Sequence, residues 1–108
     1  MATEYSIKMD FEKAKASAAK LDDVADSINQ KMENDYQELM GDVRYNWKGD
    51  NADRFLVKSE VIVEKLNTVE KNLHETADTI RRIAKNIYDA EMRALEIARK
   101  REFEGKEG

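Results

Sequence analysis

Apolar side chains recur along the first part of the chain at steps that alternate between four and three residues. Such steps keep one side of a helix turned toward a partner helix. After Met32 a strict heptad would continue at Asp35, whereas the apolar positions are Tyr36, Met40 and Val43. Because these steps lengthen to about four, we expect the coiled-coil winding to relax locally. The series up to this point consists of Ile7, Phe11, Ala14, Ala18, Leu21, Ala25, Ile28 and Met32.

A second apolar series is longer, and every step in it is three or four residues. Leu56, Val63, Ala77 and Ala84 lie beside it and widen it. An apolar face of this width can contact more than one neighbouring helix. The members of the series are Ala52, Phe55, Ser59, Ile62, Leu66, Val69, Leu73, Thr76, Ile80, Ile83, Ile87, Ala90, Ala94 and Ile97.

The two series are separated by a short polar segment that predicts a turn. Gly49 can adopt a positive φ without a steric penalty, and Asp50 or Asn51 can cap the following helix. We therefore predict one all-α domain over residues 1–108, an antiparallel hairpin of two long helices. The expected elements are a helix over about 8–44, a turn at 45–50, a helix over about 51–103 and a short flexible tail.

The second predicted helix is longer than the first and should extend beyond it. This overhang covers roughly residues 88–103, so that Met92, Leu95 and Ile97 would lack a partner within the hairpin. A two-helix hairpin has one interface and does not enclose a core. We expect two antiparallel hairpins, with their turns at opposite ends, to form a four-helix bundle. The expected dimer core is Phe55, Ile62, Leu66, Val69, Leu73 and Ile80.

The composition of the chain excludes several classes of function. The chain has no cysteine and no proline, and its net charge is −4 with acids and bases interspersed. Disulfides and thiolate metal sites are excluded, no basic stripe predicts nucleic-acid binding, and the apolar runs are too short for membrane insertion. The N-terminal residues lack the pattern of a signal peptide. His74 is the only histidine, and we expect it on the surface flanking the series, so no catalytic, cofactor or metal site is predicted.

Trp47 is the most informative single residue. It lies in a polar turn between two helices, where its indole should cover the last apolar layer near Val43 and Phe55. An indole at a bundle end that stays partly exposed is also a contact surface. Trp47, Lys48 and Gly49 form a Trp-x-Gly motif in the middle of a chain of about this length.

With this motif, its position and the two-helix pattern, the chain resembles the Trp-x-Gly family of small type VII secretion substrates. The resemblance implies secretion without a cleaved signal peptide, dimerisation with itself or a related small helical protein, and recognition by a secretion ATPase. The family's export signal is an aromatic residue followed at the fourth position by an acid. Tyr88 departs from it, with Met92 at that position and Glu91 one residue early; Phe103 with Glu107 matches it.

Two hypotheses about the function remain open. In the first, the protein is a type VII substrate, or an escort of a larger toxin with a helical N-terminal region, and the end of helix two around Tyr88, Glu91 and Phe103 is recognised. In the second, it is an intracellular helical adaptor that is not exported. The residues present give a small helical enzyme little support.

Overall fold

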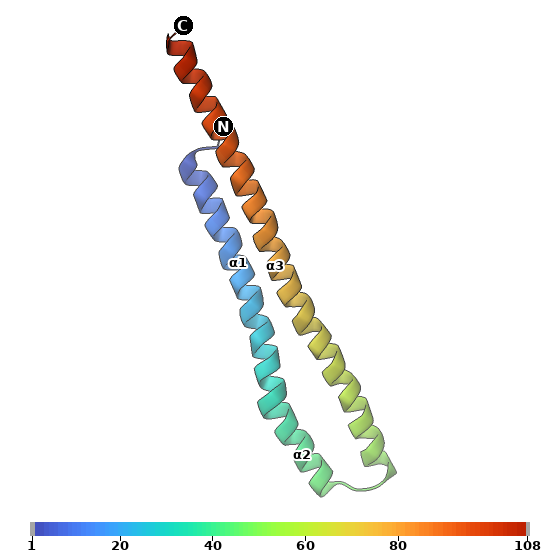
Figure 1. The fold of residues 1–108 in the computed structure, drawn as a ribbon. Helices are drawn as coiled ribbons and strands as arrows, with labels where there is room; N and C mark the ends of the chain where they lie inside the picture. Colours follow the sequence, from blue (N-terminus) through green and yellow to red (C-terminus); the bar gives the residue numbers. More distant parts are fainter. Residues whose placement is uncertain (1, 108) are drawn as a thin grey trace. The chain divides into compact units, whose positions relative to one another are not determined.

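The computed structural model describes residues 2–107, which are helical except near the N-terminus and at the turn. The elements are α1 (Glu4–Lys31), a π-helical turn (Met32–Tyr36), α2 (Gln37–Asn46) and α3 (Asp50–Glu107) (Figure 1). No strand occurs within the described residues. The predicted all-α class is confirmed.

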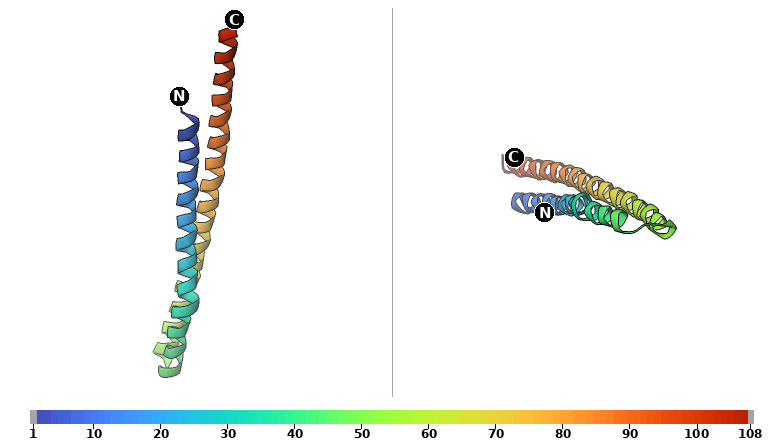
Figure 2. Two further views of the ribbon diagram at one scale, coloured as in Figure 1. Left: turned by 90° about the vertical axis from the view of Figure 1, so that its left-hand side faces the viewer. Right: turned by 90° about the horizontal axis from the view of Figure 1, so that it is seen from below.

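The chain divides into two compact units. The turn unit, residues 21–75, contains the end of α1, the π turn, α2 and the start of α3, which runs antiparallel to α2 after the turn (Figure 2). The terminal unit combines residues 1–20 with residues 76–108. Within it, the start of α1 and the second half of α3 run antiparallel.

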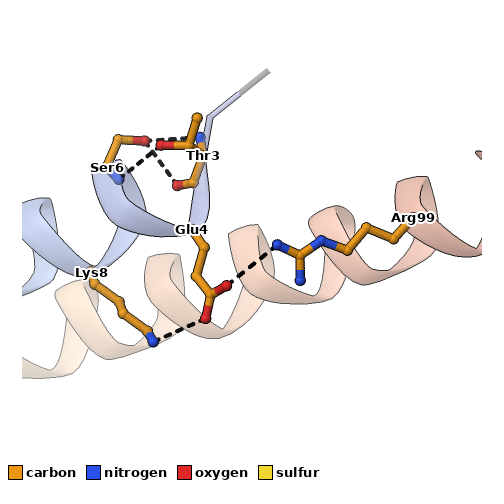
Figure 3. A network of polar contacts seen from close by, with 5 residues as sticks. All are labelled: Thr3, Glu4, Ser6, Lys8 and Arg99. Carbon is orange, nitrogen blue, oxygen red and sulfur yellow. Dashed lines mark hydrogen bonds and ion pairs between the residues drawn. The ribbon is translucent and has the colours of Figure 1, made fainter.

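The N-terminus of α1 is closed by two reciprocal hydrogen bonds (Figure 3). The amide of Ser6 donates to the Thr3 hydroxyl at 3.1 Å, and the Thr3 amide donates to the Ser6 hydroxyl at 3.0 Å. This pairing satisfies backbone donors that have no partner inside the helix. The cap explains why α1 begins at Glu4, earlier than the predicted start at residue 8.

The π turn keeps the apolar series of the first helix in register. The amide of Gln37 donates to the carbonyl of Met32, the i to i−5 bond of a π-helix. This bond absorbs one extra residue, so Met32 and Met40 are both buried, whereas Leu39 is 56 % exposed. The lengthened steps in the sequence therefore mark an inserted residue in the helix, and not the relaxed winding that we predicted.

Small side chains fill most buried positions of both units. No large side chain is fully buried among the described residues. Alanine lets two helices approach closely but leaves little apolar volume between them, so each unit has a thin core. The buried residues are Ile7, Ala18, Ala77 and Ala84 in the terminal unit and Ala25, Met32, Met40, Ala52 and Ser59 in the turn unit.

The turn follows α2 directly. Gly49 has a φ of 110°, the positive sign expected for it, and its carbonyl accepts a 3.1 Å hydrogen bond from the amide of Asp53. Gly49 therefore occupies the N-cap position of α3, whereas Asp50 and Asn51, the predicted caps, lie inside the first turn of that helix. Negative charge at Asp50 and Asp53 is favourable there because the helix dipole is positive at this end.

Both helices extend further than predicted. The first ends at Asn46, and α3 continues through Glu107, where a short flexible tail was expected.

His74 joins α3 to α1 within the turn unit. Its Nδ1 lies 2.6 Å from a carboxylate oxygen of Asp22, and its Nε2 lies 3.4 Å from one of Asp26. The hydrogen bond to Asp22 raises the pKa of His74 above its ordinary value, nearby acids including Glu70 act in the same direction, and desolvation opposes them. His74 thus lies partly exposed beside the apolar series, as expected, and it also makes a contact between helices that the sequence did not reveal.

The two interior glycines supply a matched test of backbone strain. A Cβ added at either Gly41 or Gly49 would meet nothing within 4 Å, but only Gly49 has a positive φ. We expect Gly41→Ala to stabilise the fold by about 1 kcal/mol, because alanine favours a helix interior. Gly49→Ala should destabilise it by about 1–2 kcal/mol. Thermal melting should show shifts of opposite sign, about 4–8 °C per kcal/mol; shifts of the same sign would contradict the assigned conformations.

His74 should make stability depend on pH. Because its pKa is raised in the folded state, its contribution is fully present below the unfolded pKa of about 6.5 and is lost as pH rises through the folded pKa. The melting temperature of the wild type should therefore fall as pH rises above about 6.5. His74→Gln, which does not titrate, should lack this decrease. Parallel curves for the two proteins would show that the contact with Asp22 does not stabilise the fold.

Candidate helix–helix interaction surface

One row of residues along α3 is apolar and exposed to solvent. Its members recur every seven residues, the heptad spacing at which one helix contacts another. In the turn unit Phe55, Ile62 and Val69 are 43, 52 and 44 % exposed; in the terminal unit Ile83 and Ile97 are 48 and 47 % exposed. We call this set the free row: Phe55, Ile62, Val69, Thr76, Ile83, Ala90 and Ile97.

The inner side of α3 is formed by a neighbouring row. Ala77 and Ala84 are buried, and Leu56 and Val63 are partly buried. These four residues, predicted to flank the series, lie in the intramolecular contact. Every second member of the predicted series belongs to the free row. Of the predicted dimer core, Phe55, Ile62 and Val69 are exposed and Leu66, Leu73 and Ile80 are half-buried. The wide face thus divides into an inner row, a free row and, between them, a row that we call the shared row. The apolar members of the shared row include Leu66, Leu73, Ile80 and Ile87.

A groove adjoins the free row in the turn unit. It has a volume of about 440 Å³ and is lined by Ile28, Lys31, Met32, Asp35, Tyr36, Leu39 and Leu66. Leu39 points outward because of the π turn, and Leu66 belongs to the shared row. In the terminal unit a smaller groove of about 120 Å³ lies beside Ile7, Ala14 and Ile87. Each unit therefore has a groove whose lining includes one residue of the row beside the free row, Leu66 in the turn unit and Ile87 in the terminal unit.

The outer edge of the free row carries bases and no acids. We call this edge the basic border; like the free row, it recurs every seven residues. Lys58, Lys65 and Arg93 are exposed, and no ion pair involves them within residues 2–107. The members of the border are Lys58, Lys65, Asn72, Thr79, Asn86, Arg93 and Lys100.

The Trp-x-Gly turn presents a second apolar surface. The rings of Trp47 and Phe55 lie 5.6 Å apart at an angle of 50°, so the indole does pack on Phe55. Trp47 remains 45 % exposed and Tyr45 is 82 % exposed. The amide of Trp47 donates to the carbonyl of Val43 at 2.9 Å, which fixes the backbone at the end of α2.

The candidate recognition residues do not form one exposed cluster. Tyr88 is half-buried, with its ring 4.8 Å from that of Phe11, and Glu91 is also partly buried. Phe103 is 63 % exposed. The side chain of Glu107 lies outside the described residues. Tyr88 therefore has a structural contact that the sequence did not reveal.

The predicted overhang is shorter than expected. Glu4 in the first turn of α1 pairs with Arg99 at 3.3 Å and with Lys8 at 2.9 Å (Figure 3). The hydrogen bonds with Lys8 and Arg99 lower the pKa of Glu4, and Glu4 raises the pKa of Lys8. Because α1 reaches the level of Arg99, only the last turns of α3 continue past it. Met92 and Leu95, expected to lack partners, are half-buried.

The described residues offer no arrangement for metal chemistry. Within them, no group of three or more histidine, cysteine, aspartate or glutamate side chains is placed to hold a metal ion. No helix between residues 2 and 107 is long and apolar enough to cross a membrane. The hydroxyl of Tyr36 is buried and has no hydrogen-bond partner in this part of the chain.

Comparison with known proteins agrees with this geometry. The family model of WXG100, proteins of 100 residues with WXG, matches residues 6–92. Comparisons with curated proteins and with solved structures give no significant match. Proteins of this family are small, helical and secreted by type VII systems without a signal peptide, and they are not enzymes. With its Trp47-Lys48-Gly49 turn between helices, this chain belongs to the WXG100 family.

Proposed function

We propose that this chain is a substrate of a type VII secretion system, or an escort of a larger secreted protein, and that it acts by binding another helix through the free row. The main observation behind this proposal is the exposure of the free row. Water-exposed residues such as Ile62 and Ile83 recur at heptad spacing on a helix whose inner side is already occupied. Covering one isoleucine stabilises a complex by about 1.5–3 kcal/mol.

The partner in this proposal is a second copy or a related helical protein. Two hairpins packed together enclose an interior that one hairpin lacks, as in four-helix bundles. The thin alanine-rich seams support this arrangement, because they leave most large apolar side chains outside the hairpin. A larger toxin with a helical N-terminal region offers the same kind of surface.

The secretion ATPase is the second proposed partner, and the last turns of α3 are its contact. This end extends beyond the pairing of Arg99 with Glu4, and it exposes Phe103. A helix end without intramolecular packing can be ordered by a partner. Tyr88 is a weaker candidate than the sequence suggested, because its ring packs against Phe11.

The free row can be tested with two exposed residues of α3. Ile62 belongs to it, whereas Val57 is 61 % exposed and lies on the side of α3 that faces away from the free row. We expect Ile62→Asp to weaken pairing on the order of a hundredfold, because apolar contact is lost and a carboxylate is desolvated. Val57→Asp should leave pairing unchanged. Sedimentation of the purified protein, alone and with its partner, measures both effects.

Circular dichroism of the two aspartate variants serves as the folding control. Both substitutions are at exposed positions, so both variants should remain helical. Equal affinity of the two variants would show that the free row is not the binding surface.

The end of α3 can be tested by truncation after Arg99. This truncation keeps the contact with Glu4, so we expect it to leave the melting temperature almost unchanged and to abolish appearance of the chain in the culture supernatant. Phe103→Ala should reduce export in the same way. Tyr88→Ala should instead lower stability by about 2 kcal/mol, because an aromatic contact is lost.

The comparison strain lacks the secretion ATPase, and the readout is the chain in cell and supernatant fractions. Loss of export only in that strain identifies type VII transport. Normal export of the truncated chain would contradict the proposed recognition element, and absence of export from every strain would favour the intracellular adaptor.

A further inference from the structure

We infer that the helix covering the free row belongs to a different protein chain and carries aspartate or glutamate along the edge that meets the basic border. This inference rests on the proposed function and names the chemistry of the partner. The juxtaposition that carries it is an exposed apolar row beside exposed bases that have no partner among the side chains that the structure describes.

The basic border departs from the charge of its surroundings. Acidic residues outnumber basic ones in the turn unit, and the whole chain carries −4. Even so, the turn unit presents Lys58 and Lys65 beside its part of the free row, and the terminal unit presents Arg93. Among the described side chains no ion pair neutralises these three residues, although neighbouring bases such as Lys71 and Lys85 have acidic partners on their own helix.

A second copy fits this edge poorly. In the antiparallel bundle expected from the sequence, α3 would lie beside another α3, and the two basic borders would face each other. No shift in register relieves this contact, because the border holds no acid between Lys58 and Lys100. Charges that flank an apolar row determine which partner and orientation two helices accept. The structure therefore favours a partner with acidic residues at these flanking positions.

A helix fits the surface better than a lipid surface does. The free row repeats every seven residues, which is the spacing of a helix-to-helix contact. In the turn unit the adjoining groove, formed in part by Ile28, Leu39 and Leu66, is concave and can accept side chains from a helix. An interfacial membrane helix needs only a continuous apolar face with a basic rim and makes no use of a groove. The groove beside the free row therefore favours a helical partner over a lipid surface.

The chain itself can supply the acidic probe. The variant Lys58→Glu, Lys65→Glu, Arg93→Glu keeps the free row and gives it an acidic border. We expect wild type mixed with this variant to form a one-to-one complex on the order of tenfold tighter than either protein with itself, since several charge pairs each contribute a little. The complex should weaken as salt rises from about 0.05 M to about 0.5 M, as screening requires.

The matched control is Arg54→Glu, Lys71→Glu, Arg82→Glu. It changes the net charge by the same amount on the same helix, at exposed positions that do not flank the free row. Mixing this control with wild type should give no gain in affinity. An equal gain would show that net charge, and not the border, drives association, and would overturn the inference. Circular dichroism of each variant verifies that the helices remain folded.

The remaining outcomes are also decisive. A tight wild-type dimer that the border reversal weakens would identify a second copy as the partner; the inference would fail while the proposed function stood. Binding of wild type to vesicles with anionic lipid, without binding to the acidic probe, would overturn it in favour of a membrane surface. If Ile62→Asp leaves every association intact, the proposed function itself fails.

Discussion

The close approach of helices at alanine is the constraint on which the other features depend. Ala18 and Ala77 in the terminal unit, and Ala25 and Ala52 in the turn unit, are at most 1 % exposed. Side chains this small bring two backbones together and leave little room for a large side chain at these positions. Many large apolar residues of α3 therefore lie on the shared and free rows, where they stay half-buried or exposed.

The π turn keeps the apolar series after Met32 on the side of the first helix that faces α3. A continuous α-helix would have carried Asp35 and Leu39 toward the inner contact, because one residue is inserted after Met32. By taking up that residue, the turn keeps Met40 buried at 4 % exposure and turns Leu39 outward into the groove beside the free row. A local irregularity in the first helix thus supports both the inner contact and the outer surface.

The two ends of the hairpin present different chemistry. At the turn, Gly49 allows the chain to reverse, and Trp47 packs on Phe55 while remaining partly exposed. At the other end, Glu4 connects the start of α1 to Arg99, and the last turns of α3 continue with Phe103 exposed. The free row is the surface proposed for another helix, and the end of α3 is the element proposed for recognition by the secretion ATPase. The two proposed functions can therefore be disrupted separately.

The sequence by itself determined the helices, the turn at Gly49 and the family, because periodicity, a glycine that accepts positive φ and the Trp-x-Gly motif are local properties of the chain. It did not determine which apolar row of α3 faces inward. Residues 55, 56 and 59 begin three neighbouring rows, and several positions in each are apolar, so spacing alone does not rank them. Only the tertiary structure decides which row faces inward, because it places the smallest side chains in the contact; Ala77 is buried and Ile62 is exposed. The tertiary structure also brings Tyr88 to Phe11 and His74 to Asp22.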